Sequence, residues 1–431
     1  MRHTGYFEST MSESAPGLYL LPHTVFLRRL AGATRARSLD ARLGRAAFVA
    51  LRLVDLLDPD EPTPTADAFH YQHLATERAC RGLPADRPET GHLIGVVQNT
   101  ADAFQARDVG LLFPALFAYA HYLEDEMRLE EALDVLETLE RVGGDAVRAE
   151  DQVAARLRSA RVLRKLNRFD EAERAYQQAE ELAGGIGDMH SQRLSRIGHA
   201  QVVRGRGNLG AAEQSLRTIL ADVHVDEDHE ARALAHHALA AVLRVGGRPA
   251  EAIPHAWQAF QLYDDELSRT RTLGDLGSML LMIGDVEGAE RALKGVLHRA
   301  ATEDVVTNAL IDLMSGASFH RDRVGFERWR ERCEARRDGM PPNILADFIS
   351  KVGIGRARFA QFDRAEESLA KALEIARSAG LHEVVFRIER IKSGLRECQN
   401  ELAAASEVLQ TPQVESDAVR EVSCSLARLE S

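Results

Sequence analysis

The sequence predicts an all-α fold, a solenoid built from pairs of short antiparallel helices. Two observations predict it. Residues 152–185 contain two amphipathic helical patterns joined by a tight turn at residues 165–168. Small residues also recur at a nearly constant interval along much of the chain. Together they indicate one repeating unit instead of a globule with a single core.

The recurring small residue is an alanine that serves as the anchor of each repeat. The first four anchors are 40 residues apart, and the fifth follows after 37. The anchors are Ala132, Ala172, Ala212, Ala252, Ala289 and Ala365, with Phe326 as a degenerate anchor between the last two. Twelve residues before the anchors stand Ala120, Ala160, Ala200, Ala240, Gly277, Met314 and Gly353. Since only small residues let two helix backbones approach closely, these positions predict helix–helix contacts.

Around Ala172 the pattern resembles the tetratricopeptide repeat (TPR). Bulky residues surround the small ones there, namely Leu157, Leu163, Phe169 and Tyr176. The resemblance implies a right-handed α-solenoid whose first helices line a concave groove that holds a protein or peptide. The 40-residue spacing exceeds the roughly 34 residues usual for the family. It is similar to the spacing in bacterial regulatory and peptide-sensing TPR proteins.

The predicted organisation has five parts. Prolines 59, 62 and 64 must end a first helical stretch at 23–57, and further helices are expected at 66–81 and 93–107. These helices are either eroded repeats or a cap. The expected parts are a disordered leader (1–17), an N-terminal helical region (18–110), about seven repeats (111–380, the one near 306–340 degenerate), a capping helix (381–403) and a weakly ordered tail (404–431).

Composition narrows the classes of function and location. The formal net charge is −12, which disfavours nonspecific binding of nucleic acid or anionic membranes by the whole surface. No apolar run is long enough to span a bilayer, and no secretory signal pattern is present. The four cysteines are scattered, which is typical of reduced thiols. We therefore expect a cytoplasmic protein with no membrane partner.

Several motifs resemble catalytic, metal or DNA-binding sites, but their sequence context indicates a structural role. The GxGxxG match at 205–210 follows a predicted helix instead of a strand, so it does not indicate a dinucleotide site. His70, His73 and Glu77 share a helical face, an arrangement that is common by chance. Basic residues near the N-terminus lack a helix-turn-helix pattern, which argues against DNA binding. The sequence thus predicts a non-enzymatic protein with no cofactor and no metal.

One set of polar residues is a candidate partner site. Arg164, Arg204 and Arg244 stand eight residues before three successive anchors and would form a ladder along the groove. Arginine suits carboxylate recognition because its planar fork donates two hydrogen bonds at once. A structural alternative is that the three arginines only complement helix C-terminal dipoles. The further groove candidates are Arg161, Lys165, Gln201 and His237.

Two hypotheses of function follow. The first is a TPR scaffold whose groove holds a partner segment, an acidic peptide or a C-terminal carboxylate. The alternative is a peptide-responsive sensor, a transcriptional or signalling regulator whose solenoid changes shape when the ligand binds. Neither the partner nor the oligomeric state is indicated by the sequence.

Overall fold

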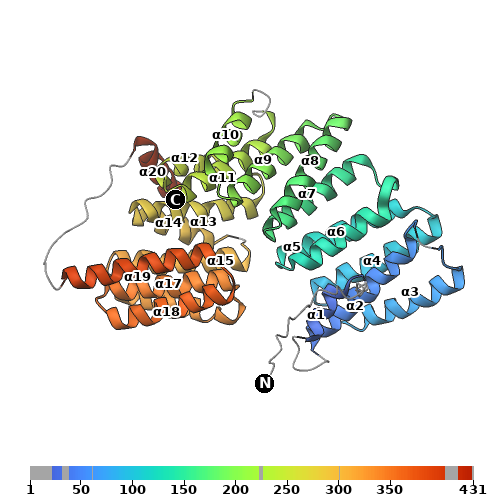
Figure 1. Cartoon of the computed structure of the whole chain (residues 1–431), viewed down its shortest axis with the longest axis horizontal. Coiled ribbons are helices and arrows are strands. Elements are labelled where there is room, and N and C mark those ends of the chain that lie inside the picture. Colours follow the sequence, from blue (N-terminus) through green and yellow to red (C-terminus); the bar gives the residue numbers. More distant parts are fainter. Residues whose placement is uncertain are drawn as a thin grey trace, which may run out of the picture. The chain divides into compact units, whose positions relative to one another are not determined.

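The computed structural model describes residues 22–31, 38–60, 62–222, 227–299, 301–402 and 416–429. In these ranges every regular element is helical, which confirms the predicted all-α fold (Figure 1). The chain folds as two compact units, Met1–Ser195 (unit 1) and Arg196–Ser431 (unit 2). The expected leader at 1–17 and residues 404–415 of the expected tail lie outside the described residues.

The helices keep their chain order in both units. Unit 1 contains α1 (Thr24–Ala31), α2 (Leu39–Val54), η1 (Asp55–Leu57), α3 (Ala66–Arg81), α4 (Pro88–Ala106), η2 (Val109–Leu112), α5 (Phe113–Asp125), α6 (Leu129–Gly143), η3 (Gly144–Ala146), α7 (Ala149–Lys165) and α8 (Phe169–Ile186). The unit boundary lies within α9 (Met189–Gly205). Unit 2 continues with α10 (Leu209–Leu220), α11 (His229–Val245), α12 (Pro249–Leu262), α13 (Glu266–Ile283), α14 (Val286–Leu297), α15 (Glu303–Phe319), α16 (Arg323–Glu334), η5 (Arg337–Gly339), α17 (Pro342–Arg358), α18 (Phe362–Ser378), α19 (His382–Leu402) and α20 (Asp417–Leu429).

From α5 to α18 the described helices form seven pairs, each with a first (A) and a second (B) helix. Each pair is joined by a turn in which one residue has a positive φ, five residues before the anchor. These residues are Met127 (59°), Asn167 (60°), Gly207 (85°), Gly247 (75°), Gly284 (88°), Arg321 (54°) and Ala360 (58°). Glycine adopts this conformation freely, whereas other residues do so at a cost. The turn therefore repeats at the backbone level even where its residue varies.

The predicted small positions lie where the two helices of a pair cross. Every alanine anchor has 0% exposed area, and so do Ala160, Ala200 and Ala240. At Gly277 a Cβ atom would lie 2.7 Å from Leu293 Cγ, so α13 and α14 approach too closely for any side chain. The prediction that these residues permit close packing is confirmed.

The degenerate repeat also folds as a pair, α15 and α16. Its anchor Phe326 is 1% exposed. The ring finds room because Gly355 on α17 faces it: a Cβ atom on Gly355 would lie 2.3 Å from the Phe326 ring. A large residue on one helix is thus matched by the absence of a side chain on the next.

Side-chain caps begin several B helices. Asn208 and Asp285 accept hydrogen bonds from the backbone N–H of Ala211 (3.2 Å) and Gly288 (2.9 Å). Such caps satisfy N–H groups that have no partner within the helix. They also fix the residue at which each B helix starts.

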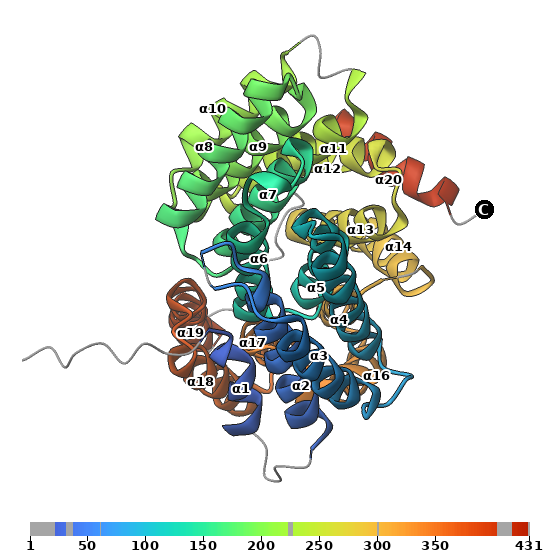
Figure 2. The ribbon, with the colours of Figure 1, turned by 90° about the vertical axis from the view of Figure 1, so that its right-hand side faces the viewer.

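The N-terminal helices pack against the first repeat of unit 1, α1 and α2 on α6 and α4 on α5 (Figures 1 and 2). His23 is buried at the start of α1, with Nδ1 2.5 Å from Asp134 Oδ2 and Nε2 3.1 Å from Asp55 Oδ1. Its pKa is raised: burial opposes protonation, but the two carboxylates outweigh that effect. These contacts join α1 to both η1 and α6.

The stretch predicted to be helical at 23–57 contains α1, α2 and η1 among the described residues. The start predicted for the helix at 93–107 was wrong, because α4 already begins at Pro88. Proline is tolerated at the first helical position, where its missing N–H would have had no partner.

Candidate binding groove

Charged and polar side chains form a row along the A helices of unit 2. His237 on α11, Asp275 on α13, Asp312 on α15 and Lys351 on α17 each stand 37 to 39 residues after the one before. The A helices α13, α15 and α17 contact one another in order. We call these four residues, with their neighbours Asp347 and Arg387, the charged row.

The first part of the charged row is centred on Asp275. The Nε2 of His237 lies 3.0 Å from Asp275 Oδ2, and the Tyr263 hydroxyl lies 3.2 Å from His237 Nδ1. With the Nε2–H tautomer, His237 donates to Asp275 and accepts from Tyr263. Burial opposes ionisation of Asp275, but the hydrogen bond from His237 and nearby cations lower its pKa. The imidazole therefore positions an ionised carboxylate.

The second part of the charged row is centred on Lys351. Its Nζ lies 2.5 Å from Asp312 Oδ1 and 2.8 Å from Asp347 Oδ2. Arg387 on α19 lies 3.0 Å from the other oxygen of Asp347. Burial disfavours the charged lysine, but the two carboxylates raise its pKa. These ion pairs tie α15, α17 and α19 together.

The charges beside the row reach beyond neighbouring helices. Burial opposes ionisation of Asp275, although 41% of its side chain is exposed. The charge of Arg244 on α11 also helps to lower the pKa of Asp347 on α17.

Two arginines beside the charged row form no close ion pair with any described residue. Arg244 on α11 and Arg271 on α13 are partly buried, and the charges of both act on Asp275. Among the described residues neither forms an ion pair or a hydrogen bond through its guanidinium group. Arg244 was predicted from its place in the repeat. Arg271 was missed; the signal was its position four residues before Asp275 on one helical face.

In unit 1, two predicted groove residues have a structural role. Glu124 on α5 has 0% exposed side-chain area and is bound by Arg158 (2.6 Å), Arg161 (2.7 Å) and Lys165 (2.7 Å) of α7. Burial would raise the pKa of Glu124, but the three cations lower it to about 2. Arg161 and Lys165 thus neutralise a buried carboxylate and tie α5 to α7.

The remaining candidates divide between the units. Arg164 lies on α7 in unit 1, partly buried, and its Nε has no hydrogen-bond partner among the described residues. Gln201 and Arg204 lie on α9 in unit 2 and are also partly buried. Because Arg164 belongs to one unit and Arg204 and Arg244 to the other, the ladder of three arginines stays a prediction.

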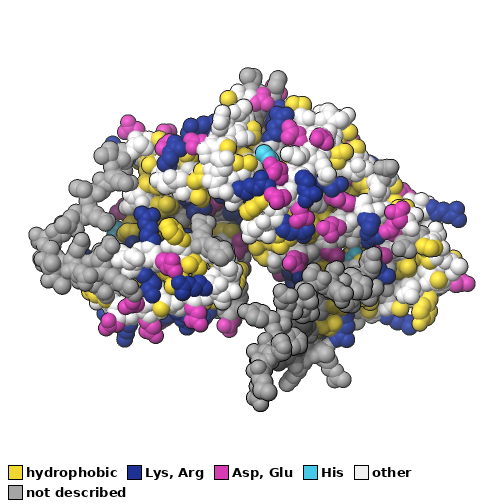
Figure 3. Space-filling view, in the orientation of Figure 1, with side chains coloured by type: hydrophobic (Ala, Val, Ile, Leu, Met, Phe, Trp, Pro, Cys, Tyr) yellow, Lys and Arg dark blue, Asp and Glu magenta, His cyan; other side chains and the backbone are white. Residues whose placement is uncertain are grey.

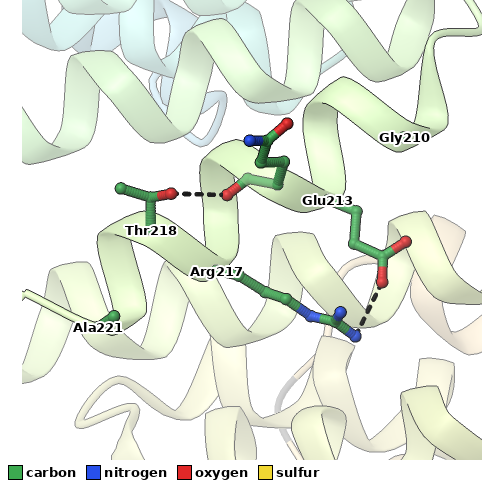
Figure 4. A pocket seen from close by; sticks show the side chains of 6 residues that line it. Gly210, Glu213, Arg217, Thr218 and Ala221 are labelled. Carbon is green, nitrogen blue, oxygen red and sulfur yellow. Dashed lines mark hydrogen bonds and ion pairs between the residues drawn. The ribbon is translucent and has the colours of Figure 1, made fainter.

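A depression of about 530 Å³ lies on the surface of unit 2. It is lined by Glu213, Arg217 and four neighbours on α10 and at its C-terminal end (Figure 4). An ion pair of 2.8 Å between Arg217 and Glu213 crosses it. In the space-filling view, charges of both signs are intermixed on the visible face (Figure 3).

The described ranges contain neither a metal-binding cluster nor a membrane-spanning helix. No three His, Cys, Asp or Glu side chains there are placed to hold a metal ion. None of the described helices combines the length and the apolar character that crossing a bilayer requires.

No protein-family model matches the chain, and no curated protein matches it. Solved structures do match. A Rap protein complexed with competence and sporulation factor is 12% identical, with a TM-score of 0.41, over 83% of this chain and 99% of that chain. The apo quorum sensor NprR from B. thuringiensis is 10% identical, with a TM-score of 0.48, over 81% and 90%. The apo form of RapI is 11% identical, with a TM-score of 0.49, over 79% and 98%.

Proposed function

We propose that this chain is a non-enzymatic binding scaffold and that the A-helix face of unit 2 holds an extended peptide or protein segment. The observation that supports it is the pair Arg244 and Arg271, two partly buried arginines beside the charged row that form no close ion pair with the described residues. Each can donate two parallel hydrogen bonds to one carboxylate. The proposed ligand therefore carries a carboxylate, either an acidic side chain or a free C-terminus.

The charged row also favours a responsive scaffold over a passive one. Its contacts join α11 to α13, α15 to α17 and α17 to α19. A ligand that replaces one of these contacts alters how neighbouring helix pairs are held. The second candidate function is therefore a sensor, in which ligand binding shifts the population of solenoid shapes.

The test uses synthetic peptides of five to eight residues, each made with a free and with an amidated C-terminus. Affinities are measured by fluorescence polarisation for wild type and for the R244Q/R271Q variant. We expect wild type to prefer the carboxylate form about 10-fold or more, the value of a charge-assisted hydrogen bond. The variant should lose that preference.

The matched control is Arg291→Gln on α14, a B helix, where the arginine pairs with Glu287 at 3.6 Å. This variant should keep the wild-type preference. Equal binding by R244Q/R271Q and wild type would refute the site. If the chain is a sensor, saturating peptide should change the radius of gyration of wild type in small-angle scattering. An unchanged radius would contradict the sensor and favour the scaffold.

A further inference from the structure

The last described helix, α20, packs on B helices that are distant from it in sequence. It contacts α12 and α14, the second helices of two successive pairs of unit 2. Both ribbon views show it lying along α12 (Figures 1 and 2). This surface belongs to the B helices, so it is separate from the A-helix face that bears the charged row.

The contact is made by a narrow apolar stripe. Val419, Val422 and Leu426 are 1%, 3% and 2% exposed. Their spacing of three and four residues places them on one face of the helix. The other face of α20 is exposed, including Arg420 and Cys424. Three buried side chains make a small interface compared with the crossings within the helix pairs.

One polar contact sets the register of α20. The Ser423 hydroxyl donates to Oδ2 of Asp285. Asp285 is the residue whose Oδ1 caps α14 through the backbone N–H of Gly288. The start of α14 therefore binds a hydroxyl next to the apolar stripe. The surface formed by α12 and α14 thus selects a helix by the position of its hydroxyl as well as by its buried apolar area.

We propose that the seam between α12 and α14 is a docking surface for an amphipathic helix of a partner protein, and that α20 is its resident, exchangeable occupant. The partner helix carries apolar residues at the spacing of Val419, Val422 and Leu426, with a hydroxyl after the second. The seam accepts such a helix in the structure itself. α20 thus competes in cis with the partner and sets the concentration at which the partner binds.

The proposal is tested with the full-length chain and a fluorescein-labelled peptide covering residues 416–429. In the V422D/L426D variant, charges on the buried stripe undock α20 and leave the seam open. We expect the peptide to bind this variant at least 10-fold more tightly than wild type. A peptide with the same two aspartates should not bind, and a peptide with Ser423→Ala should bind several-fold more weakly.

Hydrogen exchange locates the peptide. Amides of α12 and α14 should exchange faster in V422D/L426D than in wild type, and the peptide should restore their protection. Failure of the peptide to bind a folded variant would overturn the proposal. Unfolding of the variant, and of the milder V422A/L426A, would also overturn it, because α20 would then be an integral part of unit 2. Light scattering could also show that wild type forms dimers and that V422D/L426D does not. That result would assign the seam to a second copy of this chain and overturn the proposal of a partner helix.

Discussion

Replacement of Glu124 by glutamine is the sharpest test of how unit 1 is held together. Glu124 has 0% exposed side-chain area and faces Arg158, Arg161 and Lys165. Glutamine keeps the shape of the side chain and removes its charge. Three cations would then face one another in a partly buried place, with only an amide oxygen to accept from them.

The magnitude follows from the pKa of Glu124, which falls from 4.5 to about 2. A shift of that size corresponds to about 3 kcal/mol of stabilisation of the ionised form. The loss expected for Glu124→Gln at pH 7 is therefore about 3 kcal/mol, in the range measured when one partner of a buried ion pair is removed. With a typical urea m-value for a domain of this size, the urea midpoint for unfolding of unit 1 should fall by about 1 M.

The stabilisation that Glu124 contributes should depend on pH. The pKa of Glu124 is lower in the folded chain than in the unfolded chain, so its stabilising contribution is complete above about pH 4.5. The contribution is lost as the pH falls toward 2. The difference between wild type and Glu124→Gln should therefore shrink to roughly half by pH 3.

The assay can separate the two units, because Trp257 and Trp329 both belong to unit 2. Tryptophan fluorescence should report an unchanged urea transition, whereas hydrogen exchange of α5 and α7 should report the loss. Glu171→Gln is the control, since Glu171 is 40% exposed and pairs with Arg168 on the surface. The reasoning is refuted if α5 and α7 keep their protection, or if the loss is equal at pH 3 and pH 7.

Three further outcomes are expected. Ala240→Leu should destabilise unit 2 by about 1–3 kcal/mol, since the fully buried position has no room for added methyl groups; an unchanged tryptophan-fluorescence midpoint would contradict this. Ala360→Gly should raise the stability of unit 2 by up to about 1 kcal/mol in urea titrations, because φ is 58° there, and a lower midpoint would argue against strain in the turn. For His23, whose pKa is raised by Asp134 and Asp55 despite burial, stabilisation is complete below pH 6.5 and lost as pH rises through the folded pKa; His23→Ala should therefore lower the hydrogen-exchange protection of α1 more at pH 6 than at pH 9, and the reverse order would refute the assignment.

The helix pairs could be predicted from sequence because their signal is local and repeated. Ala160, Ala200 and Ala240 each mark a helix crossing by residue size alone. The match between Phe326 and Gly355 could not be predicted, since it depends on which residue of the next A helix faces the anchor. The degenerate repeat therefore looked irregular in sequence, although its packing is regular.

The candidate site was harder to predict than the fold. Arg161 and Lys165 were predicted as groove residues. The structure shows that both bind Glu124, a residue on the preceding A helix, and their place in a ligand groove stays a prediction. A signal was present: Glu124 stands eight residues before Ala132, the position that Arg164 holds in the next repeat. Charge pairing between repeats depends on side-chain reach and orientation, which spacing alone does not specify.

The left-handed turn within each helix pair bears on how such chains diverge. Asn167, Gly207, Gly247 and Gly284 suit the conformation, but Met127, Arg321 and Ala360 adopt it with ordinary side chains. The residue type at this turn position thus varies among the helix pairs, whereas the positive φ is kept. In distantly related chains, a positive φ in the turn would therefore identify each helix pair more reliably than a consensus of amino acids.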